Sequence, residues 1–359
     1  MSRAGLWVAQ AAPILASLAL AFLLAVLFAL ILGVSPGEML SVVASRFGTY
    51  AWGQVLYKAT FLIFTGLAVA LAFSGGLFNI GAEGQAVIGS LTCALVGILA
   101  APWPAVLLLP LAIAGAFLGG GLWGLIPGWL KARWGTHEVI NTIMLNFIAL
   151  ALSNFLIARH LGLPETVRTA EIGPGASLPR LDGIVPGMRG AAVNVSLVLA
   201  VVCAVLAHLF LRHTRAGLEL RAVGGGRRQA WMLGIQPAGR TRLAFFLAGG
   251  MAGLVGTNFV LGYKHYYEDG FSGGIGFLGI AVALLARNQP LMVVPAALFF
   301  GFLSQAGLLV NTMLPREVVD ILTGAILLTF IAGEKLRQRW VRQQGVPGHG
   351  IAPAAGRGA

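Results

Sequence analysis

The sequence predicts an all-α polytopic membrane protein with about ten transmembrane segments, and three observations lead to this fold class. Of the 359 residues, 58% are hydrophobic and only 10% are charged, and the mean hydropathy is +0.86. The apolar residues gather in long runs separated by short loops. The net charge of +12 would suggest nucleic acid in a soluble chain, but the Arg and Lys residues here flank apolar runs and orient helices instead, so we exclude nucleic-acid binding.

The apolar runs, taken in order, give the expected spans. About 20 helical residues cross a hydrocarbon core of about 30 Å. The ten segments cover residues 14–32, 59–73, 82–101, 105–126, 139–157, 193–211, 243–261, 276–286, 291–310 and 318–332. Segment 59–73 is short and ends at two glycines, and segment 276–286 is only half a span. Cys93 and Cys203 lie inside apolar runs and are interpreted as small core residues.

The loops divide the chain and orient it. The expected parts are an N-terminal anchor helix with an amphipathic connector (1–58), a first transmembrane repeat (59–157), a periplasmic loop (158–192), a transmembrane helix with a cytoplasmic coupling loop (193–242), a second repeat (243–334) and a basic cytoplasmic tail (335–359). In the connector, Trp52 and Tyr57 are possible interface anchors. With both termini in the cytoplasm, two-thirds of the Lys and Arg residues lie on the cytoplasmic side, as the positive-inside rule requires.

The stretch SGGLFNIGAEGQAVIG, residues 74–89, predicts a broken helix. Its adjacent glycines end the preceding helix after Phe73, Asn79 is an expected N-cap of the helix that restarts at Ile80, and Glu83 falls in the first turn. Broken polar backbone survives at membrane depth only inside protein or against a wet cavity. We therefore interpret the stretch as one wall of a translocation route, although local helix capping explains Asn79 and Glu83 equally well.

Two short matches predict an internal repeat. IGAEGQAV at 80–87 matches IGFLGIAV at 275–282, and HEVIN at 137–141 matches REVVD at 316–320, in the same order. In the expected topology the two copies run in opposite directions, as in inverted repeats, where interrupted helices at matching places point to a midplane substrate route. The polar residues are unequal, since Asn79, Glu83 and Gln85 face apolar or glycine positions in the second copy. We expect the first half to use them alone.

Four motifs resemble one known family. FNIGAEGQ (78–85), THEVINTIMLNFIA (136–149), GLELRAVGGGRRQAWMLGI (217–235) and GFLGIAVALLARNQP (276–290) closely resemble the longer permease subunit of bacterial ABC importers for nucleosides, within the wider simple-sugar and branched-chain amino-acid permease family. The resemblance covers nearly the whole chain. This sequence departs from the pattern at Leu278, where relatives often carry an acidic residue, and at 226–230, where relatives carry an Asn-Pro-Ala-Ala-like stretch.

The resemblance implies a transmembrane permease subunit of an ATP-driven, binding-protein-dependent importer in the bacterial inner membrane. The implied partners are a second related permease, two ATPase subunits or a fused ATPase, and a periplasmic or lipid-anchored solute-binding protein, besides membrane lipid. ATP and Mg would bind to the partner ATPase. The sequence contains no GxxxxGK[ST] phosphate loop and no His, Cys and Glu spacing typical of a metal site, so we expect no enzyme activity, cofactor or metal on this chain.

The arginine-rich loop at 212–242 is the expected ATPase contact. Residues 220–233 predict a short helix bounded by glycines, and in similar permeases this segment is the coupling helix that sits in a cleft of the ATPase. The candidate coupling residues are Arg221, Gly224, Arg227, Arg228, Gly234 and Ile235. The arginines could instead act only as topology determinants or as contacts for lipid headgroups.

Amides and aromatic rings can hydrogen-bond and stack with a neutral nucleoside. The candidate substrate-path residues are Phe78, Asn79, Glu83, Gln85, Asn141 and Asn146. Interhelical hydrogen bonding explains buried amides equally well. Three alternatives stay open at this stage: an ABC permease for simple sugars or another small solute, an ion-coupled secondary transporter that uses Glu83, and a membrane protein with a structural role only.

Overall fold

The computed structural model describes residues 33–184 and 186–311, with residues 23, 26, 27, 30, 31, 313, 321, 324 and 325. The first expected span (14–32) and the last (318–332) lie largely outside these residues. The REVVD copy at 316–320 and the tail at 335–359 lie wholly outside them. The architecture below therefore concerns the remaining segments.

The regular secondary structure of the described residues is helical, with three isolated β-bridges and no strand. The α-helices are α2 Pro36–Arg46, α3 Thr49–Ser74, α4 Ala82–Leu99, α5 Ala105–Trp134, α6 Glu138–Leu156, α7 Ser196–His213, α8 Arg215–Gly225, α9 Arg227–Met232, α10 Pro237–Gly253, α11 Ile275–Leu285 and α12 Pro290–Val310. π-Helices extend α6 over Ile157–Leu161 and follow α10 over Thr257–Lys264, and a 3₁₀ turn covers Pro174–Ala176.

Seven of these elements are long and apolar enough to cross a membrane: α3, α4, α5, α6 with its π-helical end, α7, α10 with the following π-helix, and α12. An eighth, α11, has only 11 residues, which agrees with the expected half span. Eight of the ten expected segments are thus helices among the described residues. The protein is a multi-pass membrane protein, and its helix α3 starts ten residues earlier than the apolar run predicts.

The chain forms two compact units, one of residues 52–301 and one of residues 1–51 with 302–359. Within the smaller unit, the rings of Phe47 and Phe302 pack 4.9 Å apart. The larger unit contains α4–α11 and most of α3, and it holds all of the candidate site residues.

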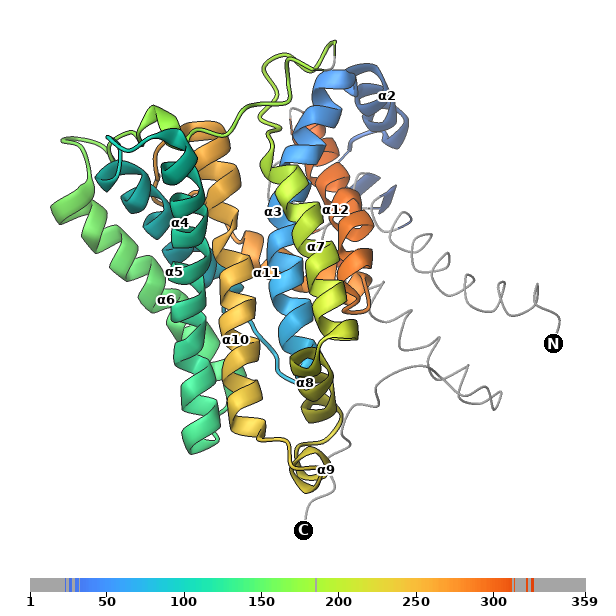
Figure 1. The fold of residues 1–359 in the computed structure, drawn as a ribbon. Coiled ribbons are helices and arrows are strands. Elements are labelled where there is room, and N and C mark those ends of the chain that lie inside the picture. Colours follow the sequence, from blue (N-terminus) through green and yellow to red (C-terminus); the bar gives the residue numbers. More distant parts are fainter. Residues whose placement is uncertain are drawn as a thin grey trace. The chain divides into compact units, whose positions relative to one another are not determined.

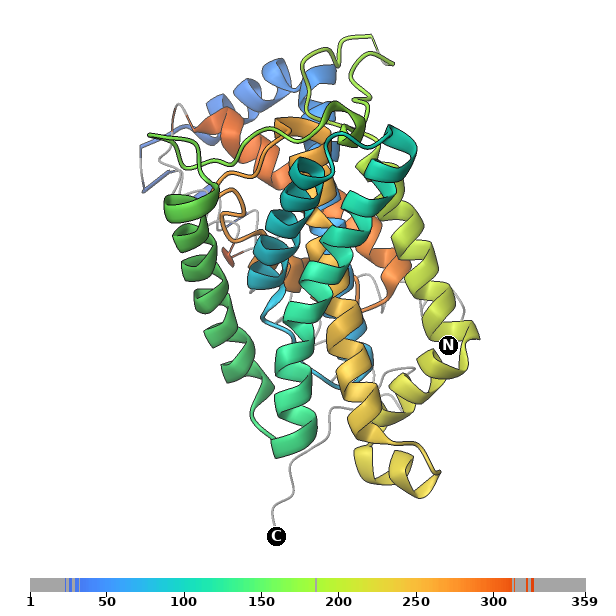
Figure 2. The same ribbon diagram turned by 60° about the vertical axis from the view of Figure 1, so that its left-hand side comes forward.

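Glycines bring α5 and α10 into backbone contact. Both views show the two helices side by side (Figures 1 and 2). A Cβ atom on Gly120 would lie 2.7 Å from the Cα of Gly253, and one on Gly124 would lie 3.0 Å from the Cα of Gly249. No larger side chain fits there, so α5, α10 and the adjacent α4 form a closely packed core.

A buried polar cluster at the other end of α10 fixes the long loop and α3. The side-chain amide of Asn258, in the π-helix, donates to the Tyr57 carbonyl at 3.0 Å and accepts from Asn194 at 2.8 Å. Tyr57 is only 9% exposed, and its ring packs against Tyr263. Tyr57 is therefore a core residue of the larger unit. The helix α3 already includes this position, and it buries the side chain inside the unit. The expectation that Tyr57 is an interface anchor is wrong.

Candidate functional site at the junction of α3 and α4

A glycine C-cap ends α3 where the sequence predicts the break. Gly76 adopts a left-handed backbone with φ of +70°, its N–H donates to the Phe73 carbonyl at 2.9 Å, and the Leu77 N–H donates to the Ala72 carbonyl at 3.1 Å. This pair of bonds closes the last turn and needs a residue that tolerates positive φ. The chain then runs without helical structure to Gly81 and restarts as α4 at Ala82.

Asn79 supports this restart from inside the loop. The N-cap of α4 is Gly81, so the expectation that Asn79 is the N-cap is wrong by two residues. Instead, the Asn79 Oδ1 accepts from the Gly81 N–H at 3.0 Å. The amides of Asn79 and Gln85 also bond reciprocally, at 2.9 and 3.2 Å. Both side chains are fully buried, and the pair closes the loop onto the first turn of α4.

Asn146 of α6 holds the same loop from the opposite side. Its Nδ2 donates to the Ile80 carbonyl at 2.9 Å, and its Oδ1 accepts from the Gly84 N–H at 2.9 Å. These are a carbonyl in the loop and an N–H in the first turn of a helix, neither of which has an intrahelical partner. Gly84 lets α6 approach, since a Cβ there would lie 2.9 Å from the Cα of Asn146.

Glu83 joins α4 to α11. Its Oε1 accepts from the Gly274 N–H at 2.9 Å and its Oε2 accepts from the Gly276 N–H at 2.6 Å. Gly274 is the N-cap of α11, with φ of +88°. The carboxylate is 3% exposed and lies at the N-termini of two helices, whose dipoles favour a negative charge. The two matched motifs, 80–87 and 275–282, therefore touch: the first supplies the carboxylate, and the second, with the adjacent Gly274, supplies the backbone N–H groups that it binds.

The remaining two path candidates lie outside this polar cluster. Phe78 is half-buried, and its ring meets the edge of Phe73 at a centroid distance of 5.1 Å. Asn141, one turn before Asn146 on α6, is half-buried and donates to the hydroxyl of Thr136. The structure thus brings together four of the six candidates. Gly274 and Gly276 were not among the candidates predicted from the sequence, although Gly276 lies in the matched motif at 275–282 and Gly274 directly precedes it.

The junction has a definite chemical character. Asn79, Glu83 and Asn146 bond backbone groups at the ends of the interrupted helices, and Gln85 holds the Asn79 amide in place. Two interrupted helices therefore meet in the protein interior with these backbone groups satisfied. The interruption is stabilised by side chains from α4, α6 and the loop itself. Broken helices of this kind surround solute routes in membrane transport proteins.

The arginine-rich segment forms two short helices where a single one over 220–233 is predicted. Thr214 caps α8, its hydroxyl accepting from the Gly217 N–H at 3.0 Å. Gly226 separates α8 from α9, and Gly234, with φ of +78°, ends α9 before the half-buried Ile235. A single helix over 220–233 does not form, because α8 runs through Gly224 and Gly225 and stops at Gly226, after which α9 starts at Arg227.

The coupling candidates divide between two sides of this segment. Arg221, Arg227 and Arg228 are exposed. So are the neighbouring apolar side chains Trp231, 69% exposed, and Leu233, 76% exposed.

An ion pair ties α8 to α10. Glu219 accepts from Arg215 at 2.8 Å and lies 2.5 Å from the guanidinium of Arg240. The hydrogen bond from Arg215, with the nearby charge of Arg240, lowers the pKa of the Glu219 carboxyl. The ion pair ties this face of α8 to α10, whereas Arg221 of the same helix is exposed.

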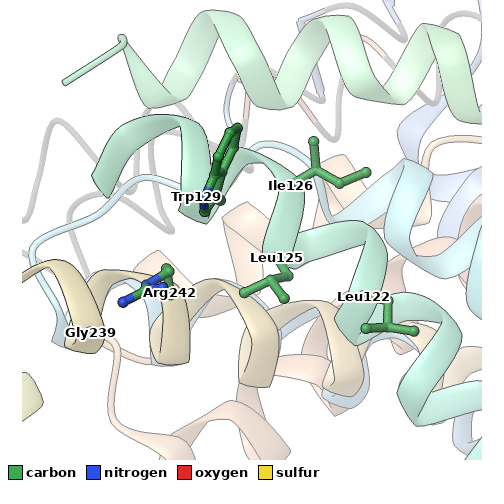
Figure 3. A pocket seen from close by; sticks show the side chains of 6 residues that line it. All are labelled: Leu122, Leu125, Ile126, Trp129, Gly239 and Arg242. Carbon is green, nitrogen blue, oxygen red and sulfur yellow. The ribbon is translucent and has the colours of Figure 1, made fainter. Parts of the chain in front are cut away.

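A surface groove lies between α5 and the first turns of α10. Its volume is about 530 Å³, and it is lined by Leu122, Leu125, Ile126, Trp129, Gly239 and Arg242. Figure 3 shows the four α5 side chains along one wall, with Arg242 of α10 opposite Trp129. The walls are apolar, and Arg242 is the cationic residue of the lining.

Seven possible spans and an interrupted, polar junction between them define this chain as a membrane transport protein. Residues 52–331 match the family described as branched-chain amino acid transport system / permease component. The chain belongs to this family. Its members are transport subunits, and the chain is accordingly not itself an enzyme.

Three relatives are similar over most of their length. The guanosine ABC transporter permease protein NupP of Bacillus subtilis is 38% identical over 87% of this chain and 94% of its own. The nucleoside ABC transporter permease protein NupB of Lactococcus lactis subsp. cremoris is 35% identical over 78% of each chain. The glucose ABC transporter permease protein TsgB13 of Haloferax volcanii is 34% identical over 91% of this chain and 88% of its own.

Proposed function

We propose that the chain is the transmembrane permease subunit of an ATP-driven, binding-protein-dependent importer whose solute is a nucleoside. The names of NupP and NupB support this substrate class, and that of TsgB13 supports a simple sugar as the second candidate. The single observation that carries the transport role is the junction of α3 and α4, where buried side chains hold an interruption between spans. We place the solute route along this junction, with Phe78, Asn79, Glu83, Gln85, Asn141 and Asn146 beside or behind it.

In this proposal, α8 and α9 dock the ATPase on the cytoplasmic side. The exposed residues Arg221, Arg227, Arg228 and Gly234, with Ile235 at the end of α9, form the surface that meets the ATPase. ATP and Mg bind to that partner. Exposed tryptophan and leucine beside arginine suit a protein interface, because aromatic residues and arginine are enriched in interface cores. A second related permease and a periplasmic or lipid-anchored solute-binding protein complete the importer in the bacterial inner membrane.

The topology follows from the same assignment. Both termini and the loop at 212–242 are cytoplasmic, and the loop at 158–192 is periplasmic. Segments 59–157 and 243–334 are the two inverted repeats. The contact between the motifs at 80–87 and 275–282 supports this arrangement, since interrupted helices of two repeats would meet at the route. An ion-coupled carrier is less well supported, because both carboxylate oxygens of Glu83 already accept backbone N–H groups.

Uptake of radiolabelled guanosine tests the substrate and the energy source together. Cells that carry this subunit with its partners should accumulate guanosine, unlabelled glucose should not compete, and inactivation of the ATPase should abolish uptake. Competition by glucose would move the assignment to a sugar. Uptake that persists without a functional ATPase and collapses with the proton gradient would establish an ion-coupled carrier instead.

Charge reversal tests the ATPase surface. Arg227→Glu with Arg228→Glu should leave the subunit in the membrane and remove both ATPase association and transport. Arg46→Glu with Arg133→Glu is a matched control, because both residues are exposed, lie at the ends of α2 and α5 outside the arginine-rich loop, and give the same change in charge. Normal ATPase association in the first double variant would refute this surface.

A further inference from the structure

The C-terminal end of α8 packs directly on the glycine break after α3. A Cβ atom on Gly224 would collide with the Ser74 carbonyl oxygen and would lie 2.8 Å from the Gly76 nitrogen. In the opposite direction, a Cβ on Gly76 would lie 3.0 Å from the Cα of Gly224. Figure 1 shows α8 beside the lower end of α3. The two backbones therefore touch with no side chain between them.

One face of α8 makes this contact. Leu220, one turn before Gly224, is 1% exposed, and its Cδ1 would lie 2.9 Å from a Cβ on Gly75. Residues four apart share a helix face, so Leu220 approaches the buried Gly75 and Gly224 approaches Gly76 from the same face of α8. Gly225, the next residue, faces open space.

We infer that Gly224 is a positioning residue through which α8 sets the conformation of the α3–α4 junction. This inference rests on the proposed docking of an ATPase on α8 and α9. Side chains absorb small shifts by changing rotamer, whereas a backbone-to-backbone contact passes them on because close-packed interiors deform little. A displacement of α8 moves Ser74–Gly76, and five residues further along, Ile80 and Gly81 carry the bonds to Asn146 and Asn79. Gly224 therefore acts on the side of α8 that contacts the α3–α4 junction, apart from the ATPase surface.

Alanine at two adjacent positions tests this role. Gly224→Ala should reduce transport by about tenfold or more, because an added methyl group overpacks the contact. The complex should still assemble with its ATPase and hydrolyse ATP. Gly225→Ala adds the same methyl group to the same helix in open space and should transport within about twofold of the unaltered protein. Equal transport by the two variants, or loss of ATPase association in Gly224→Ala, would overturn the inference.

A compensating pair removes the ambiguity of a folding defect. Gly75→Ala should impair transport because its Cβ meets Leu220 Cδ1, and Leu220→Val, which removes that atom, should restore it in the double variant. Failure of the double variant to recover would show that the contact is not the cause. If the proposed ATPase docking on α8 and α9 were itself wrong, Arg227→Glu with Arg228→Glu would keep normal ATPase association, whatever Gly224→Ala and Gly225→Ala showed, so the two failures are distinguishable.

The groove between α5 and α10 carries a second, independent inference. Its floor is apolar from Leu122 to Ile126, and its other end holds the indole of Trp129 and the exposed guanidinium of Arg242 (Figure 3). Arg242 makes one weak bond to the Ala238 carbonyl of its own helix, at 3.4 Å. An apolar trough that ends in a tryptophan and a cation is complementary to a lipid with an anionic headgroup. We propose that this groove binds one anionic phospholipid, with the phosphate at Arg242.

Photoactivatable lipid analogues test the groove in the full-length protein. In nanodiscs of phosphatidylcholine, a phosphatidylglycerol analogue should cross-link to the peptide spanning residues 122–129 with about fivefold preference over a phosphatidylcholine analogue. Arg242→Gln should abolish the preference, Arg242→Lys should keep most of it, and Arg133→Gln on the last turn of α5 should leave it unchanged. Equal cross-linking of both analogues, or loss of cross-linking when a second permease is present, would overturn the proposal.

Discussion

The α3–α4 junction and the α8–α9 segment both concentrate polar residues, but they use them in opposite ways. At the junction, Asn79, Glu83, Gln85 and Asn146 are at most 3% exposed, and each bonds a backbone group or another amide. On α8 and α9 the arginines point outward. The buried polar residues of the junction maintain an interrupted backbone, whereas the exposed arginines Arg221, Arg227 and Arg228 are available to a partner. Substitutions in the two regions should therefore fail in different ways.

The largest effect should come from Glu83→Ala. The variant leaves the Gly274 and Gly276 N–H groups without an acceptor, which costs about 3 kcal/mol of folding free energy. Thermal unfolding of the detergent-solubilised protein measures the loss. Glu219→Ala removes a carboxylate outside the membrane spans and serves as the control with a much smaller effect. An unchanged Tm for Glu83→Ala would show that the α4–α11 bridge does not stabilise the fold.

Asn146→Ala should follow with a loss of about 2 kcal/mol, since the Ile80 carbonyl and the Gly84 N–H both lose a buried partner. Asn141→Ala is the matched control on the same helix, where one half-buried bond to Thr136 is worth about 0.5 kcal/mol. Thermal unfolding should rank the two variants in this order. Equal Tm values would remove the distinction between a junction residue and a residue that is merely near it.

A smaller effect should depend on pH. The pKa of the Glu219 carboxyl is lowered in the folded protein, so its ion pairs stabilise the fold above the ordinary value of about 4.5 and stop doing so as the pH falls through the lower, folded value. The difference in Tm between the unaltered protein and Glu219→Gln should therefore be present at about pH 6 and shrink below about pH 4.5. A difference that grows on acidification would contradict the ion pair with Arg215 and Arg240.

The smallest change in stability should come from Arg227→Ala with Arg228→Ala. Both side chains are exposed, so the free energy of unfolding, measured from the Tm, should change by no more than about 0.5 kcal/mol. ATPase association should fall. A large loss of stability in this variant would mean that the arginines support the fold, and the contrast between the two regions would no longer hold.

The site of the helix break could be predicted from sequence because its signals are local. Paired glycines after an apolar run, followed by an amide and a carboxylate, predict both the end of α3 near Phe73 and the restart of α4. The C-cap at Gly76 forms from residues 72–77 alone. For the same reason the half span at 276–286 is visible in the sequence and agrees with α11.

The partners of these residues could not be predicted, because they depend on contacts between distant segments. Glu83 bonds residues more than 190 positions away, and the Gly224 contact with the break has no sequence signature beyond a glycine run. The start of α3 was missed for a different reason. Its first turns contain Gly53, Gln54 and Lys58, which lower the local hydropathy although Ala51 and Val55 are buried. The REVVD copy of the repeat lies outside the described residues.

The bridge from Glu83 to α11 also has a consequence for the integrity of the polypeptide. If the chain is divided between α6 and α7, the N-terminal part supplies the Glu83 carboxylate and the C-terminal part supplies the two N–H groups. The glycine contact between α5 and α10 joins the same two parts a second time. A break at the exposed positions around Gly183, between them, would cut the chain without removing either connection. The protein should therefore tolerate being made as two separate pieces that find each other in the bilayer.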